Sequence, residues 1–249
     1  MNSAASRWIR RLARFAALTL EDQRVLEEAA STAGIRYASH ENVAKAGESA
    51  NRLLVVLEGL LYRYRLLPDG RRQILGYLLA GDMCDSRELL VPQVGETMYA
   101  LGPAEIVMLS VHSVQRLERQ PNIALAMARH AFMQQAITRE WLINVGQRSA
   151  FERLGHLICE IHERLAAVGL THDHAFDLPL TQAELGDTLA LSAVHVNRTL
   201  MELRRLKLVS FQNRQVLIHD YAALQAAAGF NPGYLSTHEV RQVSLENMA

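Results

Sequence analysis

Cysteine, net charge and long apolar runs are all scarce in this sequence of 249 residues. Its two cysteines, Cys84 and Cys159, are too few for a disulfide framework or a four-thiolate metal site. No uncharged apolar run reaches the roughly 18 residues of a membrane-spanning helix, so we expect no membrane partner. Basic and acidic residues number 26 each, and this balance identifies no partner, because a small basic face can be offset elsewhere.

The amino terminus has no acidic residue before Glu21 but carries four arginines. Organelle transit peptides share that composition. The spacing of Trp8, Leu12, Phe15 and Leu18 instead fits an amphipathic helix whose apolar side faces a core. Because no apolar stretch followed by a cleavage site is present either, we expect a cytoplasmic protein.

Proline, glycine and aspartate divide residues 35–111 into short apolar segments. The clearest of these segments are 53–57, 60–66, 73–79 and 106–109. Strands of this length, separated by turn residues at such spacing, predict a small antiparallel β-barrel or jelly roll.

A long helix is predicted from Pro121, because proline suits the first turn of a helix and the next proline lies far downstream. Apolar residues follow two stripes along it, so the helix needs two neighbours, which we expect to be its own barrel and a partner chain. Burial in the core of a single chain is the alternative. The second stripe contains Leu125, Phe132, Ala136 and Ile143. The first stripe, expected at the dimer interface, consists of Ile123, Met127, His130, Gln134, Ile137 and Trp141.

Two helix starts lie close together in the last third of the chain. Thr181 and Glu184 have the spacing of a capping box, and Ser192 offers a second N-cap a few residues later. Two short helices joined by a tight turn form a helix-turn-helix. Residues 208–218 then predict a β-hairpin wing, whose turn contains Asn213, a residue that tolerates positive φ.

A local basic excess follows the second helix start. Between residues 195 and 214, five basic side chains face only Glu202. Contact with DNA phosphates needs such an excess, since each neutralised phosphate releases a counterion. Asn197 and Arg198 lie near the helix start, from which side chains reach base edges. DNA binding is therefore the favoured interpretation, and a solvated helix face beside a hairpin is the alternative.

Five short segments stand out along the chain: Leu57-Glu58-Gly59, Leu79-Ala80-Gly81-Asp82, Gln147 to Leu154, Leu180 to Leu185 and Leu191 to Leu200. They resemble landmarks of the Crp/Fnr superfamily of bacterial transcription regulators, and the resemblance extends over nearly the whole chain. The carboxyl-terminal segments are specific, whereas the barrel is matched by its strand pattern and two short motifs. Members of the family have an amino-terminal cyclic-nucleotide-binding-type barrel, a dimerising helix and a carboxyl-terminal winged helix-turn-helix.

The resemblance implies a domain order within an α+β protein. Residues 1–120 are the expected sensor barrel, 121–146 the dimerisation helix, 147–230 the winged helix-turn-helix and 231–249 a short extension. A homodimer of this kind places two recognition helices in successive major grooves of a pseudo-palindromic site. Its expected partners are double-stranded promoter DNA and RNA polymerase.

DNA contacts are implied position by position. Thr181 and Ser192 match positions that touch phosphates in the family, and Arg198 matches its base-reading arginine, which suits guanine. Val194 stands where the family usually has glutamate; valine accepts no hydrogen bond but can meet a thymine methyl group. Ala190 occupies a turn position often held by glycine, which predicts mild strain. The expected DNA contacts are Thr181, Ser192, Val194, His195, Asn197, Arg198 and Arg214.

The cyclic-nucleotide pocket of the family lacks its key groups in this chain. The position of the ribose-binding glutamate holds Ser86, and Glu96-Thr97 replaces the phosphate-binding Arg-Ser pair. An acid beside a phosphate is repulsive by about 1–4 kcal/mol at a surface-like dielectric, so we do not expect cyclic AMP to be the effector. The small-molecule effector is left unidentified, and control without any effector is the alternative. The effector-pocket candidates are Cys84, Ser86, Arg87, Glu96 and Thr97.

Cofactor-binding patterns are weak. No cysteine precedes Cys84, so no iron–sulfur cluster is expected. Redox control through Cys84 is an alternative to an effector, although a lone cysteine is more often a small buried apolar residue. The most ligand-like cluster, Thr-His-Asp-His at residues 171–174, falls in a predicted loop and is expected to be solvated. We therefore predict no metal site.

An enzyme and a docking adaptor are the rival interpretations. Cupin-type barrel enzymes hold a metal with strand-borne histidines, but no histidine occurs between His40 and His112. A nucleophile elbow, a phosphate loop and a His-Glu-x-x-His motif are all missing from the sequence. We therefore predict that the protein is not an enzyme. An adaptor that uses its winged helix to bind another protein stays open.

Overall fold

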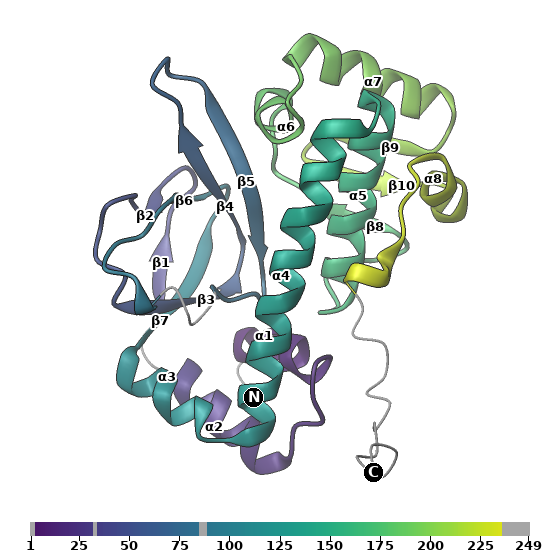
Figure 1. The fold of residues 1–249 in the computed structure, drawn as a ribbon. Helices are drawn as coiled ribbons and strands as arrows, with labels where there is room; N and C mark the ends of the chain where they lie inside the picture. Colours follow the sequence, from purple (N-terminus) through teal and green to yellow (C-terminus); the bar gives the residue numbers. More distant parts are fainter. Residues whose placement is uncertain (1–2, 32–33, 85–88, 236–249) are drawn as a thin grey trace, which may run out of the picture.

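The computed structural model describes residues 3–31, 34–84 and 89–235. Two β-sheets lie on one side of a long helix, a helix–strand domain lies on the other, and three short helices lie below the sheets (Figure 1). This arrangement confirms the predicted α+β class. None of the helices in the described ranges has both the length and the apolar character needed to cross a membrane.

Two antiparallel sheets form the amino-terminal domain. Their strand orders are β1-β7-β3 and β2-β6-β4-β5. The four segments predicted from the sequence correspond to β3, β4, β5 and β7. The strands are β1 (Ile35–Tyr37), β2 (Asn42–Ala44), β3 (Arg52–Glu58), β4 (Leu60–Leu66), β5 (Arg72–Leu79), β6 (Thr97–Ala100) and β7 (Ala104–Ser110).

Gly59 makes the tight connection between β3 and β4. Its φ of 90° lies in the region that favours glycine, and a Cβ at this position would lie only 2.6 Å from the carbonyl oxygen of Pro103. The Leu-Glu-Gly motif therefore reflects close approach of two backbones at this corner of the domain.

Three helices cover the lower end of the sheets: α1 (Ser3–Ala13), α2 (Leu20–Ala30) and α3 (Val111–Glu118). Trp8 and Leu12 of α1 are completely buried, and Phe15 just after it is 1% exposed. The predicted amphipathic helix is therefore confirmed, because its apolar side packs into the core.

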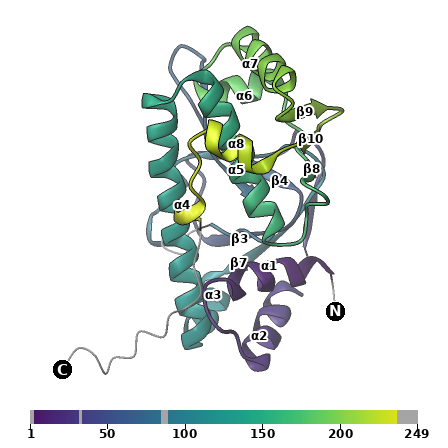
Figure 2. The same ribbon diagram turned by 90° about the vertical axis from the view of Figure 1, so that its right-hand side faces the viewer.

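The long helix α4 (Pro121–Gln147) runs from the amino-terminal helices to the carboxyl-terminal domain, and α5 (Ala150–Ala166) turns back beside it (Figure 2). A capping box starts α5, in which the backbone N–H of Glu152 donates to Ser149 Oγ at 3.3 Å. The chain thus changes direction close to the division expected between residues 146 and 147.

The stripe of α4 predicted to form the dimer interface instead packs inside the chain. Ile123 and His130 are completely buried and Trp141 is 7% exposed, because this side of α4 faces the amino-terminal domain and α5. The prediction is corrected here: Ile123, Met127, His130, Ile137 and Trp141 are core residues, and Gln134 is half-buried.

The other stripe of α4 faces solvent. Leu125 is 43% exposed, Phe132 64%, Leu142 71% and Ile143 48%. Both stripes have helical spacing, so the sequence pattern alone did not decide which of them the chain itself covers.

The carboxyl-terminal domain is a winged helix-turn-helix, as predicted. Its three-stranded sheet has the order β8-β10-β9. Its elements after α5 are β8 (Ala175–Asp177), α6 (Gln182–Leu189), α7 (Ala193–Arg205), β9 (Val209–Gln212), β10 (Gln215–Ile218), α8 (Tyr221–Ala227) and the 3-10 helix η2 (Pro232–Tyr234).

Candidate nucleic-acid interface

Both predicted caps begin the two helices of the helix-turn-helix. The backbone N–H of Glu184 donates to Thr181 Oγ1 at 3.2 Å, and the Glu184 carboxylate accepts from the backbone N–H of Thr181 at 2.8 Å. At the start of α7, the backbone N–H of His195 donates to Ser192 Oγ at 3.2 Å. Each cap satisfies amide groups that an uncapped helix start leaves unpaired.

The turn between α6 and α7 is tight and strained. Ala190 has φ 54° and ψ 46°, the left-handed conformation that costs an alanine about 1–2 kcal/mol. Gly186 lies against the same turn, where a Cβ would come within 2.5 Å of the carbonyl oxygen of Leu191. The predicted strain at Ala190 is therefore present, and Gly186 allows the close approach.

The second helix, α7, has one buried and one exposed face. Val196 and Leu203 are completely buried, whereas Val194 is 81% exposed. Asn197 and Arg198, one turn after Val194, are also exposed. The i, i+3 and i+4 spacing places these three side chains on one outward face.

The other predicted contact residues are distributed around this face. Thr181 and Ser192 are exposed at the two helix starts, and the side chain of His195 is half-buried. Asn197 Nδ2 donates to Gln182 Oε1 at 3.2 Å, which joins α7 to the start of α6. Arg214 lies on the turn of the wing, and its carbonyl oxygen accepts from the backbone N–H of Leu178 at 2.8 Å.

Strand β5 of the amino-terminal domain contacts α6 directly. Arg72 Nε donates to Asp187 Oδ2 at 2.7 Å. The hydroxyls of Tyr77 and Thr188 form a buried hydrogen bond of 2.5 Å. These contacts fix the first helix of the helix-turn-helix against the sheet while the outward face of α7 stays exposed.

A buried charge network joins the same two domains. Asp82, directly after β5, forms ion pairs with Nε of Arg11 in α1 at 3.1 Å and Nη2 of Arg164 in α5 at 2.7 Å. All three side chains are at most 2% exposed, and His130 Nε2 lies 3.3 Å from Asp82 Oδ1. Burial by itself raises the pKa of Asp82, but the guanidinium groups of Arg11 and Arg164 outweigh it and hold this pKa well below its usual range.

Glu160 of α5 extends this Asp82 network to α4 and η2. Its carboxylate accepts hydrogen bonds from Trp141 Nε1 at 2.9 Å, from the Tyr234 hydroxyl at 2.9 Å and from Arg164 Nη1 at 3.2 Å. Burial raises the pKa of Glu160, and these donors and the charge of Arg164 oppose that rise. The sequence did not predict this network. Of its residues, only Asp82 belongs to a segment singled out in the sequence, the Gly81-Asp82 motif.

The predicted effector-pocket residues are engaged with the protein wherever they are described. Glu96 lies 3.9 Å from Arg63 in an ion pair, and Thr97 Oγ1 accepts from the backbone N–H of Ala46 at 3.3 Å. Cys84 is 4% exposed and lines a small cavity of about 200 Å³. Ser86 and Arg87 lie outside the described residues.

The ligand-like cluster is largely solvated, as expected. His172, Asp173 and His174 are all exposed, and His174 Nδ1 lies 3.1 Å from Nε2 of the buried His162. Burial raises the pKa of the Cys159 thiol to about 12, which disfavours its reactive thiolate. Within the ranges that the structure describes, His, Cys, Asp and Glu form no group of three or more suited to a metal ion.

A sheet domain joined by a long helix to a winged helix-turn-helix with an exposed, capped second helix defines a DNA-binding regulator. Residues 35–120 match the model of the cyclic nucleotide-binding domain, and residues 152–227 match that of the Crp-like helix-turn-helix domain. Together the two matches span more than half of the chain. The chain belongs to the Crp/Fnr superfamily of transcription regulators, whose members are not enzymes.

Similar proteins support this assignment. The chain is 27% identical over 195 residues to the nitrogen fixation regulation protein FixK of Bradyrhizobium diazoefficiens, covering 78% of this chain and 81% of FixK. It is 26% identical to the transcriptional activator protein FnrL of Cereibacter sphaeroides, with coverages of 78% and 79%. The structure of FixK2 from Bradyrhizobium japonicum has the same fold, with a TM-score of 0.69 and 22% identity over 78% of this chain and 96% of that one.

Proposed function

We propose that this protein is a cytoplasmic, homodimeric transcription regulator that binds a pseudo-palindromic site in promoter DNA and contacts RNA polymerase. We also propose that its domains end at residues 120, 146 and 230, as expected from the sequence. The observation that carries it is the outward face of α7, where Val194, Asn197 and Arg198 project beside a capped helix start. A helix that presents its first turns in this way fits the major groove.

The proposed readout combines phosphate and base contacts. Thr181 and Ser192 lie at helix starts whose amides can bind phosphates, and the Ser192 hydroxyl can also donate, whereas the Thr181 hydroxyl already donates to Glu184. Arg198 offers two parallel donors, which match the O6 and N7 acceptors of guanine. Val194 presents only methyl groups, so it favours contact with a thymine methyl over a hydrogen-bonded base.

The exposed stripe of α4 supports the homodimer. Leu125, Phe132 and Leu142 are large apolar residues with 43%, 64% and 71% exposure. With the exposed Ala128, Gln135 and Arg139, they follow the alternating three- and four-residue steps of a coiled-coil seam. Pairing with the same stripe of a second copy would bury them.

Control by cyclic AMP is not part of the proposal. Glu96, at the position expected to bind the cyclic phosphate, already pairs with Arg63, and Thr97 accepts a backbone hydrogen bond. A cyclic phosphate there would have to displace these contacts and face a carboxylate.

The DNA-binding proposal is tested by selecting bound duplexes from a pool with about 30 random base pairs, long enough for two half-sites one helical turn apart. We expect a two-fold-symmetric site. Arg198→Ala should lower affinity for it about 5- to 150-fold, the loss of one bidentate base contact. Arg24→Ala, which removes an exposed arginine on α2, is the matched control and should have no effect. Folded protein that enriches no site would overturn the proposal and favour the adaptor.

The dimer is tested by sedimentation of Phe132→Glu, which places a charge in the exposed stripe. We expect the wild-type protein to sediment as a dimer and this variant as a monomer. Leu66→Glu is the matched control, because Leu66 is 63% exposed at the end of β4, away from α4. A Phe132→Glu protein as dimeric as the wild type would refute the α4 interface.

A further inference from the structure

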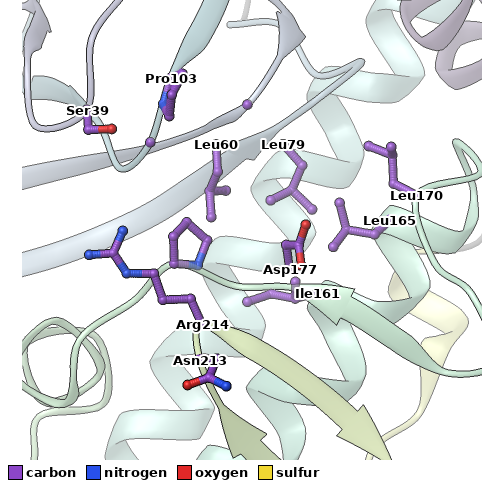
Figure 3. A pocket seen from close by; sticks show the side chains of 13 residues that line it. Ser39, Leu60, Leu79, Pro103, Ile161, Leu165, Leu170, Asp177, Asn213 and Arg214 are labelled. Atoms are coloured by element: carbon purple, nitrogen blue, oxygen red, sulfur yellow. The ribbon is translucent and has the colours of Figure 1, made fainter.

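A cavity of about 440 Å³ lies between the amino-terminal domain and the wing (Figure 3). Its size is within the range of small-molecule sites. Leu60 and Leu79 line it from the sheet, and Ile161, Leu165 and Leu170 line it from α5 and the chain that follows. The cavity is therefore largely apolar and belongs to both domains at once.

One cation projects at the rim of this interdomain cavity. Arg214 is exposed, and no hydrogen bond or ion pair of its guanidinium is found among the described residues. In Figure 3 its guanidinium points away from Asp177, toward the side of the cavity where Ser39 lies. Asp177 accepts a hydrogen bond from Gln215 Nε2 at 3.4 Å. The two rim charges thus face different parts of the opening.

The backbone at Arg214 is strained. Asn213 and Arg214 both have positive φ, 53° and 63°. A two-residue turn of this type favours glycine at its second position, and arginine is among the residues that it disfavours. The backbone is held there by the bond from Leu178 N–H to the Arg214 carbonyl oxygen. Strain retained in this way is typical of positions with a function.

We propose that the interdomain cavity binds a small organic acid with an apolar body, whose anionic group pairs with Arg214 and whose body lies against Leu60, Leu79 and Leu165. Such a ligand has matching groups for both the apolar wall and the free cation, whereas a neutral molecule leaves the cation unused.

The site also couples ligand to DNA, a part of the inference that rests on the proposed function. Arg214 lies on the wing and is one of the expected DNA contacts. An acid that pairs with it withdraws that positive charge from a DNA phosphate, so ligand weakens DNA binding. By linkage, DNA must weaken ligand binding by the same factor.

Ligand binding is tested without DNA, with 8-anilinonaphthalene-1-sulfonate as a fluorescent aromatic anion. We expect saturable binding to the purified full-length protein, displaced by decanoate below its micellar concentration and at least ten-fold less well by decanol. Arg214→Gln should weaken binding of the probe about ten-fold or more. Equal displacement by decanol and decanoate would refute the role of Arg214.

A cavity-filling variant locates the site. Gly102 lines the cavity, and a Cβ added there meets no atom within 4 Å, so Gly102→Phe fills the space without a backbone clash. This variant should lose probe binding. Gly95→Phe is the matched control, because a Cβ there is equally unhindered and Gly95 is not among the lining residues. Unchanged probe binding in Gly102→Phe would show that the probe binds elsewhere and would overturn the proposed site. If Gly102→Phe does not fold, Gly102→Leu fills the cavity with a smaller side chain.

The coupling is tested on the selected DNA site. Decanoate should lower the DNA affinity of the wild-type protein and leave that of Gly102→Phe unchanged. Probe binding as expected with DNA affinity independent of decanoate would refute the coupling while supporting the cavity. Failure to bind any DNA would overturn the proposed function, and the fluorescence experiment would still decide the ligand site.

Discussion

Asp82→Asn should uncouple the two domains, because it removes the carboxylate that pairs with both Arg11 and Arg164. The substitution keeps the shape of the side chain and one hydrogen-bonding oxygen. It removes the carboxylate that pairs with Arg11, while Arg164 keeps its ion pair with Glu160. Both arginines are at most 2% exposed, so water cannot replace the lost carboxylate. Removing one partner of a buried ion pair typically costs 3–5 kcal/mol. Since the amide oxygen can still accept one hydrogen bond, we expect a loss of about 3 kcal/mol.

Urea denaturation monitored by circular dichroism and by tryptophan fluorescence measures this loss. Trp8 and Trp141 are both buried in the regions that the network joins. We expect a lower midpoint in the variant and transitions that no longer coincide between the two probes, because the carboxyl-terminal domain then unfolds more independently.

Asp69→Asn is the matched control for the same substitution. Asp69 pairs with Arg71 at the surface, where its side chain is 52% exposed and solvent screening leaves the ion pair with little effect on stability. Combining Asp82→Asn with Arg11→Met should restore part of the lost stability, since it removes a charge that has become unpaired. If Asp82→Asn shifts the midpoint no more than Asp69→Asn does, the reasoning about the buried network is refuted.

Two further predictions concern stability. Ala190→Gly should stabilise the protein by about 1 kcal/mol in urea denaturation, because it relieves the strain of a left-handed alanine. The control Ala183→Gly, within α6, should destabilise the protein by about 1 kcal/mol. A loss of stability in both variants would refute the strain at Ala190. Burial and the nearby Arg148 lower the pKa of His156 from 6.5 to about 4. Between these two pH values the unfolded chain therefore binds a proton that the folded chain does not. The contribution of His156 to the free energy of unfolding should therefore be fully present above pH 6.5 and should fall by up to about 3 kcal/mol toward pH 4. His156→Gln should flatten this part of the pH profile. An unchanged profile in the variant would contradict the lowered pKa of His156.

Local signals in the sequence predicted the local structure of the candidate interface. The caps at Thr181 and Ser192 and the hairpin turn at Asn213 all formed where the residue types favoured them. Each depends on contacts between residues a few positions apart, so neighbouring residue types are enough to specify it. The strands that form β3, β4, β5 and β7 were predictable for the same reason, since turn residues mark their ends.

Contacts between distant residues were decided only by the tertiary structure. Two apolar stripes of similar spacing run along α4, and docking of the chain's own domains buried the stripe with Ile123 while leaving Phe132 exposed. Arg11 and Arg164 are 153 positions apart and meet at Asp82 only after both domains have folded. The cavity beside Arg214 likewise exists only between domains. Sequence periodicity specifies the faces of each element, whereas three-dimensional packing determines which face meets which, and that packing produced the charge network and the cavity.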